Sequence, residues 1–192
     1  NKLNQLSSGN SSTWCFWINI NNWYYRYDLW KNICIKGSLV KPEDELSWDS
    51  VGKQCPGIWM APNQNNIRAV FTTRRLSKDN EIKDYLEYCQ INDIPIGVWS
   101  HIAIVMVNKS IAIYLNGNLV RTCVFKGKPE LNNGPLQVSY SGGFNGQMRN
   151  FRYIGDKLGP EYIKQLYELG PNEKGNYFWQ NNVNLPKISF GC

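Results

Sequence analysis

The chain alternates apolar and polar residues with a period of two along most of its length. From Trp14 to Ile20 every second side chain is large and apolar, which is typical of a β-strand with one buried face. Similar runs follow at intervals of roughly 8–12 residues. They lie at Leu29–Lys36, Gly57–Ala61, Ile67–Thr72, Asp84–Ile91, Trp99–Val107, Ser110–Asn116, Asn118–Phe125, Leu136–Tyr140 and Gln147–Ile154. This spacing predicts an all-β fold, a two-sheet antiparallel β-sandwich.

An Asn-Gly step marks one hairpin. The strand-like segments 110–115 and 119–124 flank Asn116-Gly117-Asn118, and Asn-Gly readily adopts the positive φ that tight turns between antiparallel strands require. Together with the preceding run Trp99–Val107, these segments predict a central antiparallel meander.

A single short helix is expected near the C-terminal end of the sandwich. Pro160 favours a helix start and Gly170 a helix end. Between them, Ile163, Leu166 and Tyr167 fall on one face, so the helix would lay an apolar stripe on the sandwich.

The length of 192 residues and an apolar content of 42% fit one domain with a sizeable core. Residues 1–12 are polar and are expected to form a lead-in linker, residues 13–170 the sandwich, and residues 171–192 a tail that packs back on the domain. No apolar run approaches the roughly 20 residues of a membrane helix. Because the chain starts with Asn and shows no signal sequence, we expect any leader or membrane anchor to lie outside it.

The cysteines favour an oxidising compartment. They are scattered singly, with no C-x-x-C pair, at Cys15, Cys34, Cys55, Cys89, Cys123 and Cys192. An even, dispersed set suits up to three disulfides, with buried free thiols as the alternative. We expect Cys89 to pair with Cys123, because the two flank the meander in neighbouring predicted strands. The sequons at Asn10 and Asn108 fit the same compartment as candidate glycosylation sites.

Four motifs in this order resemble the laminin G-like jelly-roll branch of the concanavalin A-like lectin/glucanase superfamily. They are Val98-Trp99-Ser100-His101-Ile102-Ala103, Ile113-Tyr114-Leu115-Asn116-Gly117, Gly143-Phe144-Asn145-Gly146 and Tyr162-Ile163-Lys164-Gln165-Leu166-Tyr167. The resemblance covers about residues 13–170 and implies a jelly roll. It also allows calcium at the rim of the sandwich, although only Asp28 and Asp49 lie near loops and no acidic cluster marks a site. No other cofactor and no metal ligand set is expected.

Further segments resemble the copies of this domain that nucleocytoplasmic large DNA viruses encode. They are Phe16-Trp17-Ile18-Asn19 with Asn22–Tyr27, Cys55-Pro56-Gly57-Ile58-Trp59, Ile94-Pro95-Ile96-Gly97 and Leu119-Val120-Arg121-Thr122-Cys123. This likeness implies a non-catalytic adhesion or structural module displayed on a virion or a membrane, with a glycan or protein partner. A purely architectural subunit of a particle or membrane complex is the alternative.

Catalysis is not expected. A glycoside hydrolase of this fold, the competing class, needs two carboxylates that flank the scissile bond. The nearest acidic groups are Glu43-Asp44-Glu45 and Asp79, Glu81 and Asp84, which we assign to polar loops rather than to the floor of a cleft. The only imidazole, His101, begins a strand, and we expect it to be half-buried and structural.

Two groups of residues are candidates for binding. The first is the aromatic run Trp23, Tyr24, Tyr25, Arg26 and Tyr27, because sugar rings stack on aromatic faces while Arg and Asn side chains hydrogen-bond hydroxyls. The alternative is that these rings cover an edge of the sandwich.

The second group is basic and suits a polyanionic glycan or an acidic membrane. It comprises Arg74, Arg75, Lys78, Arg121, Lys126, Lys128, Arg149 and Arg152, with Lys157 beside them. A scattered net charge of +6 is also an ordinary solubility feature. Nucleic acid is not an expected partner, because the chain carries no recognised nucleic-acid motif and no basic helix.

Overall fold

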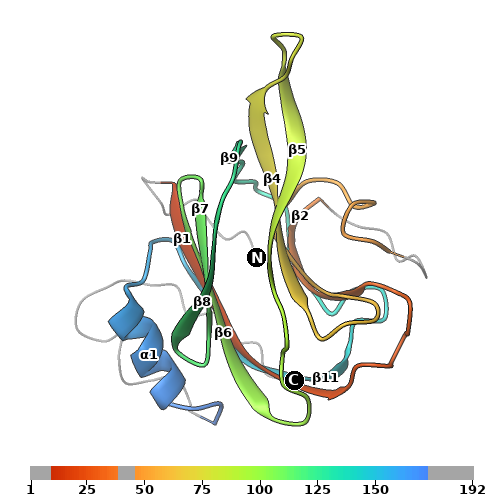
Figure 1. The fold of residues 1–192 in the computed structure, drawn as a ribbon, viewed down its shortest axis with the longest axis vertical. Helices are drawn as coiled ribbons and strands as arrows, with labels where there is room; N and C mark the ends of the chain where they lie inside the picture. Colours follow the sequence, from red (N-terminus) through yellow and green to blue (C-terminus); the bar gives the residue numbers. More distant parts are fainter. Residues whose placement is uncertain (1–9, 39–45, 173–192) are drawn as a thin grey trace.

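A computed structural model describes residues 10–38 and 46–172 and shows two antiparallel sheets packed face to face, with one helix (Figure 1). The predicted fold class, an all-β sandwich with a short C-terminal helix, is confirmed. No helix among the described residues is long and apolar enough to cross a membrane.

The first sheet has five strands in the order β11-β1-β6-β7-β8. They are β1 (Ser11–Asn22), β6 (Trp99–Val107), β7 (Ser110–Leu115), β8 (Asn118–Val124) and β11 (Asn145–Ile154). The predicted meander is β6-β7-β8, and its Asn-Gly turn has Asn116 at φ 51° and Gly117 at φ 79°.

The second sheet has the order β10-β2-β3-β4-β5, with β9 paired to β4. Its strands are β2 (Lys31–Gly37), β3 (Gln54–Met60), β4 (Ile67–Leu76), β5 (Ile82–Ile91), β9 (Lys128–Pro129) and β10 (Leu136–Val138). The two-residue strand β9 is not expected from the sequence, since it is too short for periodicity to show.

The core lies between the sheets, as the alternation predicts. The inward row of β1 consists of the buried residues Trp14, Phe16, Ile18 and Ile20, which pack against inward side chains of the other sheet such as Phe71. Successive side chains of a strand point to opposite faces, so the intervening residues of β1 lie on the outer face of the first sheet.

Helix α1 (Pro160–Glu168) covers that outer face. Ile163 and Leu166 are buried and pack with Cys15, Ala103 and Tyr114, which come from β1, β6 and β7. The helix begins with Pro160 at its first turn, as the sequence predicts.

The outer face of the second sheet is covered in part by the segment before β3. Leu46 and Val51 pack there on Trp59 and Val70. Beyond this cover, β4 and β5 continue as a long hairpin that projects from the body of the domain (Figure 1), paired as far as Leu76 opposite Ile82.

The structure describes a few residues of the expected linker and tail. β1 begins at Ser11, so the first strand takes in the last two residues of the expected linker. Pro171 and Asn172 are held by Asn150 and Arg149 of β11, and the remainder of the expected tail, 173–192, lies outside the described residues.

Candidate functional site

The loop between β1 and β2 carries the aromatic run, but Trp23 is not part of its surface. The Trp23 side chain is 4% exposed, and its Nε1 donates a hydrogen bond of 3.1 Å to the carbonyl oxygen of Ala61. A buried indole that is satisfied in this way anchors the loop on the core and leaves no face for a ligand.

The three tyrosines form the exposed part of the run, and we call Tyr24, Tyr25 and Tyr27 the tyrosine surface. Tyr24 is 76% and Tyr27 52% exposed, and their rings stack with centroids 5.7 Å apart. Tyr25 donates from its hydroxyl to the carbonyl oxygen of Gly142 at 3.0 Å. The stacked pair therefore presents aromatic faces to solvent from the loop between β1 and β2, which the loop between β10 and β11 supports through the hydrogen bond of Tyr25.

Tight turns and neighbouring loops shape this surface. Arg26 and Asp28 have φ angles of 50° and 63°, and the backbone N–H of Asp28 donates to Asn63 Oδ1 at 3.1 Å. Gly142 lies so close to Arg26 that a Cβ there would come within 2.4 Å of the guanidinium Nη1. Loops between β1 and β2, β3 and β4, and β10 and β11 thus meet at one end of the sandwich.

A buried lysine fixes the base of these loops. The Lys31 ammonium donates to the carbonyl oxygens of Leu29, Ala61 and Pro62 at 3.2, 3.4 and 3.0 Å. Burial lowers the pKa of Lys31, and the nearby Arg26 lowers it further. These carbonyls replace the water that the ammonium has lost.

The basic residues do not form one patch. Arg149 and Arg152 lie on β11 at one edge of the first sheet, whereas Arg121 lies on β8 at the opposite edge. Arg149 is placed over the ring of Trp99 at 4.8 Å and bonds Asn172. The sheet order thus separates Arg149 and Arg152 from Arg121, whereas the pairing of β9 with β4 places Lys128 opposite Arg74.

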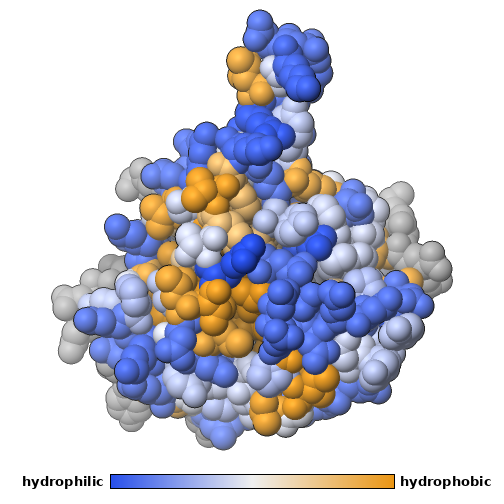
Figure 2. All heavy atoms as spheres, in the orientation of Figure 1, coloured by the Kyte–Doolittle hydropathy of each residue, from blue (hydrophilic) through white to orange (hydrophobic). Residues whose placement is uncertain are grey.

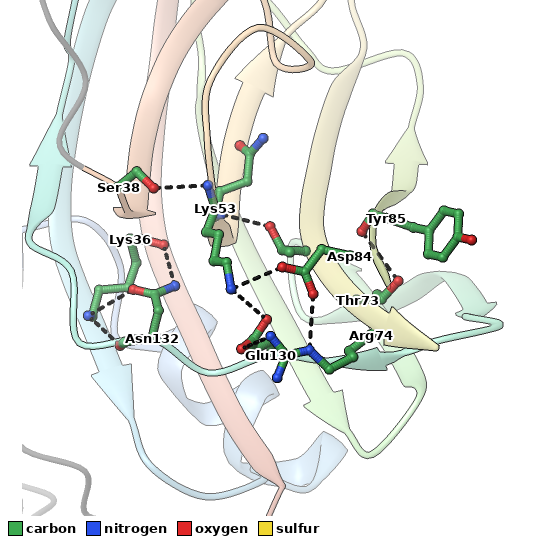
Figure 3. Close-up of polar contacts among 11 residues, drawn as sticks. Lys36, Ser38, Lys53, Thr73, Arg74, Asp84, Tyr85, Glu130 and Asn132 are labelled. Carbon is green, nitrogen blue, oxygen red and sulfur yellow. Dashed lines mark hydrogen bonds and ion pairs between the residues drawn. The ribbon is translucent and has the colours of Figure 1, made fainter. Parts of the chain in front are cut away.

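The basic residues of the projecting hairpin are engaged by acidic and aromatic neighbours. Arg74 contacts Asp84 at 3.0 Å and Glu130 at 2.8 Å, and Lys53 contacts the same two carboxylates at 3.0 and 3.1 Å (Figure 3). Arg75 lies 4.1 Å from the ring centroid of Tyr85, and Lys78 is exposed in the turn of the hairpin.

The acidic residues near the hairpin are poor candidates for general acid–base chemistry. Hydrogen bonds from Lys53 and Arg74 hold the pKa of Asp84 below its ordinary value, whereas a glycosidase acid needs a raised pKa. Asp79 and Glu81 pair with Lys83 at 3.4 and 3.1 Å. Residues 43–45, the other acidic run, lie outside the described residues.

His101 is a core residue rather than a half-buried one. It is 2% exposed, and burial, together with the nearby charge of Arg152, lowers its pKa to about 4. Its backbone N–H donates to Asn116 Oδ1, and the N–H of Asn116 donates to the carbonyl oxygen of His101, both at 2.8 Å. Two of the sequence motifs therefore meet in the meander, where they hold the turn.

The disulfide predicted between Cys89 and Cys123 is confirmed, with the Cα atoms 5.8 Å apart. For the other described cysteines the alternative of buried free thiols holds, so one of the up to three expected disulfides lies within the described residues. Cys15, Cys34 and Cys55 are buried free thiols, because Cys15 lies under α1 while the β2–β3 register places Cys34 opposite Ile58. Cys192 lies outside the described residues.

The residues do not fit a calcium centre built on carboxylates. Within the described ranges, no three side chains from His, Cys, Asp and Glu lie together in a way that could hold a metal ion. Asp28 and Asp49 are on separate loops, and Asp49 accepts a hydrogen bond from Ser47.

The two sequons lie side by side. The backbone N–H of Asn108 donates to the carbonyl oxygen of Asn10 at 2.8 Å. Asn108 is exposed in the turn between β6 and β7 with φ 53°, whereas the Nδ2 atom of Asn10 is buried without a hydrogen-bond partner. Only Asn108 presents its amide to solvent in the folded domain.

Sequence reasoning missed a cation–aromatic cluster on the outer face of the second sheet. The Arg68 guanidinium lies 4.6, 4.9 and 3.9 Å from the ring centroids of Trp30, Trp48 and Tyr88, and its Nε and Nη2 donate to Gln90 Oε1. The members come from separate segments of the chain, so no local motif marks them.

The fold and these sites define a lectin-like β-sandwich domain. The chain belongs to the concanavalin A-like lectin/glucanases superfamily, whose laminin G-like family model matches residues 1–164. No curated protein matches the chain.

Solved structures agree on the fold. The botulinum neurotoxin serotype D binding domain matches 86% of this chain at 16% identity with a TM-score of 0.59. The binding domain of botulinum neurotoxin DC matches 82% at 16% identity and a TM-score of 0.55 in its complex with rat synaptotagmin II. In its complex with SialylT the same domain matches 83% at 15% identity and a TM-score of 0.56. The chain spans 35–38% of the length of these solved chains.

Proposed function

We propose that this domain is a non-catalytic adhesion module, displayed on a virion or on the extracellular face of a membrane, and that its tyrosine surface binds a glycan. The observation that carries the proposal is the stacked, solvent-facing pair Tyr24 and Tyr27. Large aromatic rings that remain exposed at the end of a rigid sandwich offer the stacking faces that sugar rings use.

Other features support binding over catalysis. Asp84 is paired with Lys53 and Arg74, and Asp79 and Glu81 are paired with Lys83, which disfavours these carboxylates as a general acid or base. The solved neighbours include binding domains in complex with a protein, synaptotagmin II, and with SialylT. A protein that binds the same surface is therefore the alternative to a glycan.

Display outside the cytosol is supported by the Cys89–Cys123 disulfide, since such bonds persist in oxidising environments. The viral context rests on the segments that resemble viral copies of the domain. Antibody labelling of intact, unpermeabilised particles or cells that carry the protein tests display. Labelling that requires permeabilisation contradicts it.

A glycan array tests the function of the tyrosine surface. We expect the wild-type domain to bind a defined set of glycans. The variant Tyr24→Ala/Tyr27→Ala should lose that binding by about tenfold or more, since a stacking contact with an aromatic ring is worth on the order of 0.5–1.5 kcal/mol and the variant removes two rings. Tyr162→Ala is the matched control, because this helix tyrosine is 54% exposed and lies on α1. Repeating the array with a calcium chelator tests the rim calcium that the resemblance allows.

The outcomes separate the rival functions. Glycan binding that survives the double substitution contradicts the tyrosine surface as the site. Absence of glycan binding, together with a protein partner captured by the wild type and lost in the double variant, assigns the surface to a protein instead. Absence of both overturns the adhesion proposal and favours an architectural subunit.

A further inference from the structure

Strand β8 forms one edge of the first sheet, and its outer edge carries an unusual amount of apolar surface. Within residues 10–38 and 46–172, no strand pairs with β8 on the side away from β7. Leu119, Val120 and Val124 are 56%, 47% and 73% exposed, and Figure 2 shows apolar surface over this strand. An edge strand with exposed apolar side chains is a template for pairing with another chain.

The pairing register assigns the side chains of β8 to two rows. Leu119 lies opposite Tyr114, and Val124 lies opposite Ser110, so both share the outer face of the sheet, on which Tyr114 packs against α1. Arg121 lies opposite Ile113, whose side chain points into the core, so Arg121 lies on the inner side of the edge. Leu119 and Val124 therefore lie on one face of β8, and Arg121, the single cation of the strand, lies on the other.

Part of this edge is regular enough to accept a further strand. A bulge interrupts the register at Val120, and bulges at edges oppose continued pairing. From Arg121 to Val124, however, the register with β7 is unbroken. The disulfide from Cys123 to Cys89 ties this stretch to β5 and holds it in place.

The charged residues that flank β8 in the sequence have one sign, and Glu87 of β5 lies beside them, where it accepts hydrogen bonds from the backbone N–H groups of Lys126 and Gly127. No Asp or Glu occurs between Asp93 and Glu130 in the sequence. The cations of this region are Lys109, Arg121, Lys126 and Lys128. Lys109 and Lys126 lie next to each other, because Lys109 Nζ donates to the carbonyl oxygen of Lys126 at 2.9 Å. The edge is thus a narrow line of apolar side chains bordered by cations.

We propose that the β8 edge binds an extended, acidic segment of a partner protein, which adds to the sheet as a strand. Its apolar side chains, at every second position, contact Leu119 and Val124, and its carboxylates lie between them and face Arg121 and Lys126. The backbone supplies the hydrogen bonds and the alternation supplies the specificity, as in other cases of strand addition. This surface is separate from the tyrosine surface and does not depend on the function proposed for it.

A direct binding measurement tests the proposal. The probe is a fluorescein-labelled nonapeptide of alternating Val and Glu, titrated with the whole domain and followed by fluorescence anisotropy. We expect saturable binding to the wild type, which weakens by about tenfold or more in Arg121→Glu, since the substitution places like charges opposite each other. Lys157→Glu is the matched control, because it makes the same charge reversal at an exposed residue between β11 and α1, and we expect it to leave the affinity unchanged.

A second probe separates strand addition from simple charge attraction. The same peptide with N-methyl groups on alternate residues keeps every side chain but cannot pair along one edge, and we expect it to bind at least about tenfold more weakly. Equal binding of the two peptides, or equal binding to Arg121→Glu, overturns the proposal. Vesicles containing phosphatidylserine and a sulfated polysaccharide serve as competing ligands, and binding of either one with no binding of the peptide also overturns it.

Discussion

Trp17 and Tyr167 stack with their ring centroids 5.6 Å apart, and this contact joins β1 to α1 across the outer face of the first sheet. His101 completes the group, with its ring centroid 5.2 Å from that of Trp17 and 6.4 Å from that of Tyr167. The Nδ1 atom of His101 is buried without a hydrogen-bond partner. The site therefore accommodates a neutral imidazole, and a proton there would be poorly solvated.

The free energy of unfolding is expected to fall as the pH drops below 6.5, the ordinary pKa of an imidazole. The pKa of His101 is about 4 in the folded domain against 6.5 for the ordinary side chain, so between these values the unfolded chain binds the proton that the folded chain does not. The contribution is fully present above about pH 6.5 and is lost progressively toward pH 4. We expect a loss of about 1 kcal/mol per pH unit between pH 6 and pH 5 in urea unfolding.

The variant His101→Phe provides the control for this pH dependence. The chain has one histidine, so replacing it with another ring removes every imidazole and is expected to flatten the profile between pH 6 and pH 5. A profile that keeps its slope in the variant would assign the effect to carboxylates instead.

Loss of the disulfide is expected to destabilise the domain substantially. Cys89 and Cys123 are 34 residues apart in the sequence, and a cross-link of this length stabilises by about 4 kcal/mol through the entropy of the unfolded chain. Urea unfolding of Cys89→Ala/Cys123→Ala measures the loss. Dithiothreitol should destabilise the wild type by a similar amount and leave the double variant unchanged, and a reductant effect that persists in the variant would contradict this assignment.

When the protein is expressed through the secretory pathway of a eukaryotic cell, N-glycosylation is expected at Asn108 rather than at Asn10. Asn108 is exposed in a turn, whereas the amide of Asn10 is enclosed. Mass spectrometry before and after treatment with a peptide N-glycosidase should show a mass shift that Asn108→Gln removes and Asn10→Gln keeps. The reverse pattern would show that the glycan is added before this part of the chain folds.

Much of the fold follows from local patterns in the sequence. The strand rows were predictable because residues such as Phe16 and Ile18 repeat with the period of the pleat, and the Asn116-Gly117 turn because few other residues adopt its backbone angles. Strand β9 was not predictable. Lys128–Pro129 pairs with Thr73 and Arg74 of β4, beyond the residues of β4 that pair with β3. A contact of this kind depends on tertiary arrangement and leaves no periodic signal.

The candidate site was predictable only in part, because burial within an aromatic run depends on the partner surface. Nothing in the run distinguishes Trp23, which packs against the Ala61 carbonyl, from the exposed Tyr24. The Cys89–Cys123 pairing was predictable from the expected strands, but the sequence alone does not show which of the other cysteines lie too far apart to pair. Cys89 and Cys123 lie on facing edge strands, whereas Cys15 faces the helix on the far side of a sheet.

Removal of Arg68 is expected to cause a large loss of stability, although this arginine lies on the outer face of a sheet. Three rings, those of Trp30, Trp48 and Tyr88, lie within 4.9 Å of the guanidinium, and burial lowers the pKa of Arg68. A desolvated cation–π contact is worth about 2 kcal/mol, against about 0.5 kcal/mol at an exposed site. We therefore expect Arg68→Ala to lower the free energy of unfolding by about 2 kcal/mol. Arg75→Ala, which removes a cation from the single ring of Tyr85, should lower it by about 0.5 kcal/mol.

Urea unfolding gives both values. The tryptophan fluorescence of the folded protein should change only in Arg68→Ala, because only that cluster contains tryptophan. Equal losses in the two variants would show that the rings around Arg68 act as packing alone.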